Sequence, residues 1–153
     1  MHLQAAINAA TRSVASGGGP FGAVVLAPDG QTFTGTNQVT RNCDPTAHAE
    51  VVAIREACRV LGRFELSGCV LYASCEPCPM CLAACQWARL ERVEYAATAE
   101  DAAEAGFDDR LIAQGIRGEV ALATPVTRVE LPDAEDRLAP FRAWAAHGTR
   151  TDY

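Results

Sequence analysis

Two short motifs constrain this chain more than any other feature. One is a His-x-Glu sequence containing His48 and Glu50, and the other is a Pro-Cys-x-x-Cys sequence containing Cys78 and Cys81. Each motif stands at the start of a segment whose apolar residues recur with helical spacing. Imidazole nitrogen and thiolate sulfur are donors that Zn²⁺ accepts in tetrahedral sites. The motifs therefore predict one zinc ion per chain, bound by His48, Cys78 and Cys81 between two helix N-termini, whose dipoles favour thiolate over thiol.

The position at a helix start also explains the spacing of His48 and Glu50. Residues two apart do not share a face in the body of a helix, but both can project past its end in the first turn. Three protein ligands leave a fourth position on zinc for water, whose pKa the ion lowers towards neutrality. Glu50 would take a proton from this water and deliver it to a basic leaving group such as ammonia. The motifs thus predict hydrolytic replacement of an amino group.

The cysteine spacing leaves two other metal sites open. Cys75, Cys78, Cys81 and Cys85 match the C-x₂-C-x₂-C-x₃-C spacing of a bacterial iron–sulfur site, although Gln86 follows where that motif has proline. That interpretation leaves the His-x-Glu sequence unexplained, and the segment itself favours a helix. A zinc-stabilised binding module, which would not be an enzyme, would close the site with Cys75 or Cys85 as a fourth ligand.

Composition and charge limit the partners of the chain. The 153 residues carry a net charge of −6 and no lysine, so a basic surface for nucleic acid is not expected. No apolar run approaches the roughly 18 residues of a membrane span, and the N-terminal stretch lacks the features of a secretory signal. Seven cysteines in such a chain fit a reduced compartment and a metal site better than disulfides. We therefore expect a cytoplasmic protein that acts on a small molecule, with neither nucleic acid nor membrane as partner.

Hydrophobic periodicity predicts strands that alternate with helices. The expected elements are a helix over 3–16, a hairpin over 21–37, a helix over 45–62, a strand over 69–74, a helix over 80–90, a strand over 92–98, helical turns around Gly106, a strand over 125–131, and a helix over 133–148 kinked at Pro140. Asp44 or Thr46 is the expected N-cap of the helix over 45–62. The alternation indicates an α/β protein whose central sheet is covered on both faces and contains some parallel pairs.

With these motifs in place, the chain resembles the cytidine deaminase superfamily. The sequences GGPFGAVV, DPTAHAE, SCEPCPMC, WAR and DAAEAGFDD together resemble its bacterial guanine deaminase branch, densely over 17–112 and more loosely beyond. The resemblance implies an α/β fold in one domain over 1–153, a three-layer α/β/α sandwich with a five-stranded mixed sheet. It also implies a zinc-dependent aminohydrolase.

The activity that the resemblance implies is hydrolytic deamination of a purine base, most simply guanine to xanthine plus ammonia. Relatives of this branch act on other amino heterocycles, so guanosine, ammeline or another amino-triazine, and pterin are alternative substrates. A tRNA adenosine deaminase would share the zinc motif, but the charge of −6 counts against it. The zinc motif identifies only the superfamily, whereas AGFDD and the terminal tyrosine point to the guanine branch.

The resemblance also implies roles for residues outside the zinc ligands. Glu50 and Asp109 would be the catalytic acids, with Glu50 as the proton shuttle and Asp109 either contacting the purine or helping to move protons. The residues expected to bind the substrate are Asn37, Phe21, Ala49, Trp87 and Tyr153. Asn37 would hold the base, because a side-chain amide offers both a donor and an acceptor to a heterocycle. Phe21 would pack on the ring, and Trp87 would line the pocket.

The last expectation from the resemblance concerns assembly. The C-terminal segment, about 133–153, is similar to one that crosses to a partner subunit. A domain-swapped homodimer of this kind would place Tyr153 over the active site of the neighbouring subunit. The substrate wall would then contain residues of both chains.

Overall fold

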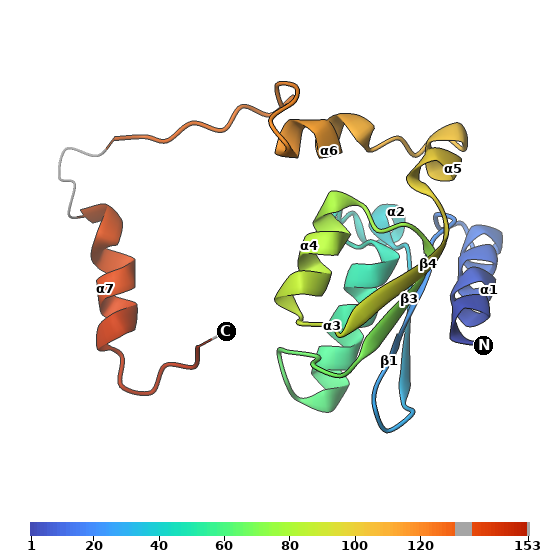
Figure 1. The fold of residues 1–153 in the computed structure, drawn as a ribbon, viewed down its shortest axis with the longest axis horizontal. Helices are drawn as coiled ribbons and strands as arrows, with labels where there is room; N and C mark the ends of the chain where they lie inside the picture. Colours follow the sequence, from blue (N-terminus) through green and yellow to red (C-terminus); the bar gives the residue numbers. More distant parts are fainter. Residues whose placement is uncertain (131–135, 153) are drawn as a thin grey trace. The chain divides into compact units, whose positions relative to one another are not determined.

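The structure is a computed structural model that describes residues 1–130 and 136–152. The chain divides into two compact units, Met1–Val120 and Ala121–Tyr153. The first unit contains the sheet and most of the helices (Figure 1). Among the described residues, no helix is both long enough and apolar enough to cross a membrane.

The first unit is organised around a four-stranded mixed sheet with the strand order β2-β1-β3-β4. Its strands are β1 (Gly22–Leu26), β2 (Thr32–Thr36), β3 (Val70–Cys75) and β4 (Arg92–Ala97). β1 pairs antiparallel with both β2 and β3, whereas β3 and β4 run parallel. The parallel pair needs a crossover, which α4 (Pro79–Trp87) supplies. The hairpin and the parallel pairing predicted from the sequence are confirmed.

Helices cover both faces of this sheet, with α1 (blue) on one side and α3 and α4 (green) on the other (Figure 1). The helices of the first unit are α1 (His2–Ala15), α2 (Val39–Asn42), α3 (Ala49–Leu61), α4, α5 (Ala99–Glu104) and α6 (Arg110–Ile116). Gly106, between α5 and α6, has a φ of 93°, as a loop between two short helices requires. The predicted α/β fold with helices on both faces of the sheet is confirmed.

Two glycines allow the helices to lie close to the hairpin. A Cβ at Gly22 in β1 would lie 2.6 Å from the backbone nitrogen of Ala10 in α1. A Cβ at Gly35 in β2 would lie 2.6 Å from the backbone nitrogen of Ala53 in α3. Gly35 pairs with Ala23, the neighbour of Gly22, so the two glycines face opposite sides of the sheet. The first turns of α3 are therefore held directly against the backbone of β2.

The buried core lies between the sheet and α3. Val25 and Leu71 from the strands are fully buried, as are Ala53 and Ala57 from α3. α4 joins the same cluster through Cys85. Burial of this apolar surface is the main force that fixes the two helices on the sheet.

The described residues contain four strands, whereas the resemblance implies five. The sequence predicts a strand over 125–131, but 125–130 have no regular structure, and Leu131 lies outside the described residues. A strand is stable only when a neighbour takes up its backbone hydrogen bonds and one of its faces is buried. All residues over 125–130 are exposed, so the apolar side chains of the predicted strand are not buried.

The start of α3 also differs from the expectation. Its N-cap is His48, not Asp44 or Thr46. The Asp44 carboxylate instead accepts hydrogen bonds from the backbone N–H and the hydroxyl of Thr46, at 2.8 and 2.7 Å, in the turn before the helix. The helix stops where predicted, at Gly62, which is left-handed with a φ of 65°.

In the second unit, the described residues form the short 3₁₀ helix η1 (Asp136–Leu138) and the helix α7 (Ala139–Ala146). Pro140 lies in the first turn of α7 and starts the helix rather than kinking it, because a first-turn N–H has no acceptor within the helix. Residues 133–135 of the predicted helix lie outside the described residues. The remainder of that prediction agrees with η1 and α7.

Candidate active site

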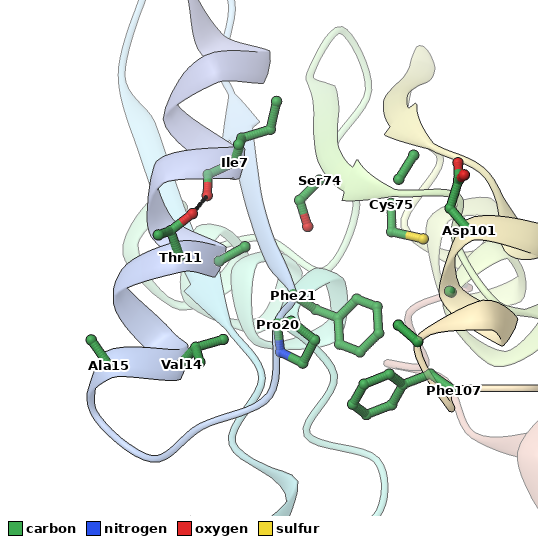
Figure 2. A pocket seen from close by; sticks show the side chains of 14 residues that line it. Ile7, Thr11, Val14, Ala15, Pro20, Phe21, Ser74, Cys75, Asp101 and Phe107 are labelled. Atoms are coloured by element: carbon green, nitrogen blue, oxygen red, sulfur yellow. Dashed lines mark hydrogen bonds between the residues drawn. The ribbon is translucent and has the colours of Figure 1, made fainter.

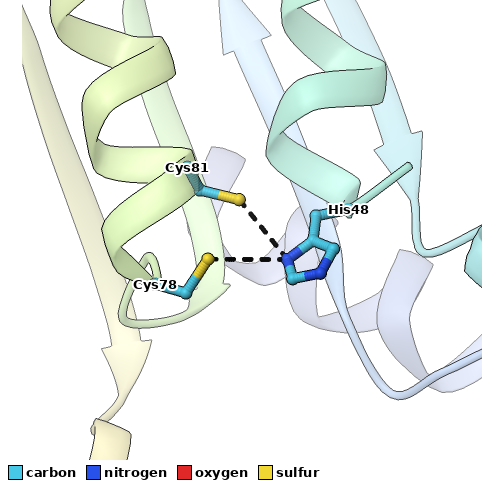
Figure 3. Close-up of side chains that lie close together, drawn as sticks. All are labelled: His48, Cys78 and Cys81. Atoms are coloured by element: carbon cyan, nitrogen blue, oxygen red, sulfur yellow. Dashed lines mark hydrogen bonds between the residues drawn. The ribbon is translucent and has the colours of Figure 1, made fainter. Parts of the chain in front are cut away.

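The histidine and the two cysteines of the zinc motif meet between the starts of α3 and α4 (Figure 3). His48 is the N-cap of α3 and Cys78 is the N-cap of α4, each with an extended backbone, and Cys81 lies in the first turn of α4. The Sγ atoms of Cys78 and Cys81 lie 3.6 and 3.5 Å from Nδ1 of His48. One donor atom of each residue lies within 4.8 Å of the other two. The three side chains are close enough to bind a single ion.

The chemistry of these donors fits zinc. Two sulfurs and one imidazole nitrogen form one of the ligand sets that Zn²⁺ accepts. A hydrogen bond from Cys81 lowers the pKa of Cys78 despite its burial, and the hydrogen bond with His48 lowers it further. The helix N-termini favour the thiolate in the same sense. Within the described part of the chain, no other group of three His, Cys, Asp or Glu side chains is arranged in this way.

The two neighbouring cysteines do not join the cluster. The Cys75 thiol donates a hydrogen bond to the backbone carbonyl of Thr98, 3.4 Å away. Cys85 lies one helical turn beyond Cys81 in the core, and burial raises its pKa to about 12. An iron–sulfur site would need the sulfurs of both Cys75 and Cys85, and a closed four-ligand zinc site would need one of them. Neither sulfur lies with the cluster, so neither site is formed. Three protein ligands are the set that leaves a position for water.

A buried carboxyl group stands beside the cluster. Glu50, the second residue of α3, is only 8% exposed. Burial raises the pKa of its carboxyl group, and the charge of Cys78 raises it further. The pKa of His48 is raised mainly by its hydrogen bond with Cys78, with smaller contributions from the charges of Glu50 and Asp109. A carboxyl group that binds a proton more readily than in water can accept one at this site and pass it on.

The same features occur in a known protein family. Residues 1–97 match the family model of the cytidine and deoxycytidylate deaminase zinc-binding region. The chain belongs to this family. His48, Cys78 and Cys81 form the zinc-binding triad of the deaminase, and the membership predicted from its motifs is confirmed.

The similarity of the deaminase to known proteins extends over its full length. It is 48% identical to the guanine deaminase of Bacillus subtilis (strain 168) over 153 residues, which make up 99% of this chain and 96% of that protein. An X-ray structure of guanine deaminase from Bacillus subtilis superposes with a TM-score of 0.93 at 48% identity and covers 99% of this chain and 96% of its own. A solved mutant protein in complex with 8-azaguanine is 31% identical, with a TM-score of 0.66 and coverage of 76% of this chain and 71% of its own.

Three further predicted site residues lie near helix or strand ends of the deaminase. Ala49 is the first residue of α3 and is fully buried. Asp109 is the N-cap of α6; burial raises the pKa of its carboxyl group, and the charge of Cys78 adds to this rise. Asn37 directly follows β2, and its Oδ1 accepts a hydrogen bond from the backbone N–H of Val39 at 3.2 Å. Asp109 is thus close enough to the triad for mutual electrostatic effects.

Phe21 lies at an apolar cavity that does not include the zinc ligands (Figure 2). Its ring packs edge-on against Phe107, with 5.0 Å between the ring centroids and an interplanar angle of 87°. The cavity has a volume of about 560 Å³ and lies between α1, the end of β3 and α5. The contact of Phe21 with a substrate ring stays a prediction.

Trp87 lies at the opposite end of α4 from Cys78. It is the last residue of this nine-residue helix, about 13 Å along the helix axis, and is 71% exposed. The described residues do not bring Trp87 together with the triad, so its place in the pocket stays a prediction. Tyr153 lies outside the described residues.

Glu76 was not among the predicted site residues, yet it holds the loop that leads to Cys78. Its backbone N–H donates to the carbonyl of Ala97 at 2.8 Å, and its Oε2 accepts a hydrogen bond from the backbone N–H of Ala99 at 3.1 Å. The first N–H groups of α5 have no acceptor within the helix, and the Glu76 carboxylate supplies an acceptor for one of them. The signal in the sequence is an acidic residue between the end of a predicted strand and a zinc-binding cysteine.

Proposed function

We propose that the deaminase hydrolyses guanine to xanthine and ammonia. The observation that carries this proposal is the 48% identity to Bacillus subtilis guanine deaminase over 99% of the chain. The triad and the buried Glu50 beside it supply the groups that hydrolytic deamination needs. The similarity to a protein solved with 8-azaguanine supports a purine-like substrate.

The reaction replaces the amino group at C2 of guanine by oxygen from water. Zinc held by His48, Cys78 and Cys81 would supply a water molecule of lowered pKa. Glu50 accepts a proton from the attacking water and delivers it to the departing amino nitrogen. A C2–O bond forms, the C2–N bond breaks, and ammonia leaves with the proton that Glu50 carried. Burial raises the pKa of the Glu50 carboxyl group, which favours its protonated form more than at an exposed position.

Other residues of the first unit would hold the base. The Asn37 amide donates to an acceptor on the heterocycle through Nδ2, since its Oδ1 is bound to Val39. The backbone N–H of Ala49 has no acceptor within α3 and is a second donor for the base. Asp109 contacts the exocyclic amine. Phe21, Trp87 and the partner's Tyr153 complete the proposed pocket.

We further propose that the protein is a cytoplasmic homodimer in which the segment of about 133–153 crosses to the partner subunit. Leu138, Phe141 and Trp144 are 38, 70 and 43% exposed. Their spacing of three residues places them on one side of η1 and α7, so this segment has an apolar face that a second copy could bury. None of the seven cysteines forms a disulfide, which fits a reducing compartment.

Ammonia release by the zinc-loaded protein tests the substrate. Guanine should be turned over with a kcat/KM at least about tenfold above that of guanosine, ammeline, pterin, adenosine and tRNA. Turnover of another amine but not of guanine would contradict the guanine proposal while leaving the zinc chemistry in place. Turnover of none of them would contradict deamination itself.

Light scattering tests the assembly. The full chain should have the mass of a dimer, and a chain truncated before residue 133 should lose that mass and its activity together. A full-length monomer with full activity would contradict the exchange of the C-terminal segment.

A further inference from the structure

The loop between α1 and β1 contains three consecutive glycines, which the proposed reaction leaves without a role. Gly17 has a φ of 80°, as is common where a helix ends. The backbone N–H of Gly18 donates to the carbonyl of Ser13 at 2.8 Å. These features attach the loop to the C-terminal end of α1 and so determine where Gly19 lies.

Gly19 lies directly against the side chain of Asn37. A Cβ at Gly19 would be 3.0 Å from Cγ and 3.1 Å from Oδ1 of Asn37, closer than the ordinary contact range of 3.4–4 Å. The φ of Gly19 is not in the left-handed region, so the backbone alone does not require glycine. The need for glycine comes from the close approach of the Asn37 amide.

Asn37 has little room to move away from such a contact. Its backbone N–H donates to the carbonyl of Phe21 at 3.1 Å, which fixes the main chain at the end of the hairpin. Its Oδ1 accepts the hydrogen bond from Val39, which fixes the rotation of the amide. Within the described part of the chain, Nδ2 of Asn37 has no acceptor. The amide therefore has one half bound to the protein and one half free for a ligand.

We propose that Gly19 is a positioning residue for substrate recognition. Its missing side chain lets the loop close on the Asn37 amide and hold it with Oδ1 towards Val39 and Nδ2 free to donate. The ligand group recognised there is a hydrogen-bond acceptor, a carbonyl oxygen or an unprotonated ring nitrogen of the heterocycle. This inference rests on the proposed function, because it assigns Asn37 to the base.

A double-mutant cycle tests this role. The variants Gly19→Ala and Asn37→Ala are made singly and together, and the kinetics of ammonia release from guanine are measured. Gly19→Ala should raise KM about three- to tenfold, the effect of losing one hydrogen bond, while kcat changes less. In the Asn37→Ala background, the same substitution should leave KM unchanged, because no amide remains to be displaced.

Gly30→Ala is the matched control. Gly30 lies in the hairpin turn with a φ of 89° and nothing near its Cβ, so alanine strains the backbone without contacting the site. This variant should lose stability and keep the wild-type KM, which separates positioning from general destabilisation.

Three results would overturn the role of Gly19: an unchanged KM in Gly19→Ala, an equal rise of KM with and without the Asn37 side chain, or the same rise in Gly30→Ala. If the wild type deaminates another heterocycle and not guanine, the proposed function fails. The same cycle, measured on that heterocycle, then still decides whether Gly19 positions Asn37.

Discussion

His48 and Cys78 cap two different helices, and Nδ1 of His48 lies 3.6 Å from Sγ of Cys78. An N-cap residue keeps an extended backbone, so the connection before the helix determines where its side chain lies. The hairpin leads through α2 to His48, and β3 leads to Cys78. The zinc site is thus a product of two chain segments that the sheet places side by side, with both helix dipoles directed at it.

His48→Ala and Cys78→Ala should each abolish stoichiometric zinc binding, because each removes one of three ligands. Each variant should also unfold more easily. Zinc at a free concentration of about 100 times its Kd adds about 2.7 kcal/mol to the free energy of unfolding, and the variants lose this contribution. Zinc per chain by atomic emission and Tm by calorimetry measure both effects. Cys75→Ala and Cys85→Ala are the controls and should retain one zinc per chain. Loss of zinc from either control would reveal a fourth sulfur ligand and contradict the open site.

Glu50→Gln should retain zinc and fold normally but lower kcat about 10²- to 10⁴-fold, because an amide keeps the shape of the side chain and cannot carry the proton. Ammonia release and zinc content are measured on the same preparation. Glu56→Gln is the control on the same helix: Glu56 pairs with Arg59 at the surface, 2.7 Å away, and kcat should not change. A Glu50→Gln variant with more than about a tenth of the wild-type kcat would exclude Glu50 as the proton shuttle.

Gly35→Ala should lower the free energy of unfolding by about 1–3 kcal/mol, because its Cβ would press on the backbone of α3 at Ala53. Urea unfolding followed by circular dichroism measures the change. Gly148→Ala has open space around its Cβ and should stay within about 0.5 kcal/mol of the wild type. Equal stability of the wild type and Gly35→Ala would show that α3 does not lie so close to β2.

Thr98→Ala should destabilise the start of α5 by about 1 kcal/mol. The Thr98 hydroxyl accepts a hydrogen bond from the backbone N–H of Asp101 at 3.2 Å, and the Asp101 carboxylate accepts one from the backbone N–H of Thr98 at 2.8 Å. Amide hydrogen exchange over Ala99–Glu104 should accelerate. Thr11 donates its hydroxyl hydrogen bond to the carbonyl of Ile7 in its own helix, at 3.1 Å, so Thr11→Ala should leave exchange in α5 unchanged. Unchanged exchange in Thr98→Ala would mean that this capping box does not hold α5.

The zinc ligands and Glu50 could be predicted from the sequence because each belongs to a motif at a helix start, where a few residues determine the local geometry. The hairpin and the parallel strands could be predicted for a similar reason, since alternation and turn residues act over short distances. The predicted N-cap of α3 was wrong. Asp44 and Thr46 have side chains typical of an N-cap, but these side chains form hydrogen bonds in the turn before the helix.

The contacts between distant segments could not be predicted in this way. The strand expected over 125–131 has an alternating pattern, but residues 125–130 have no regular structure and are exposed. The contact of Gly19 with Asn37 depends on how α1 and the hairpin end at the same place. The packing of Phe21 on Phe107 likewise joins residues that only the folded sheet brings together.

The central position of β3 has a consequence for how the protein acquires its metal. β3 lies between β1 and β4, and it is the segment that joins the helix after His48 to the loop before Cys78. Until this strand has docked, Cys78 and Cys81 are neighbours in the chain, but the imidazole of His48 is 30 residues away in sequence. The complete set of three ligands therefore exists only once the sheet has assembled, so tight zinc binding at this site reports that the first unit has folded.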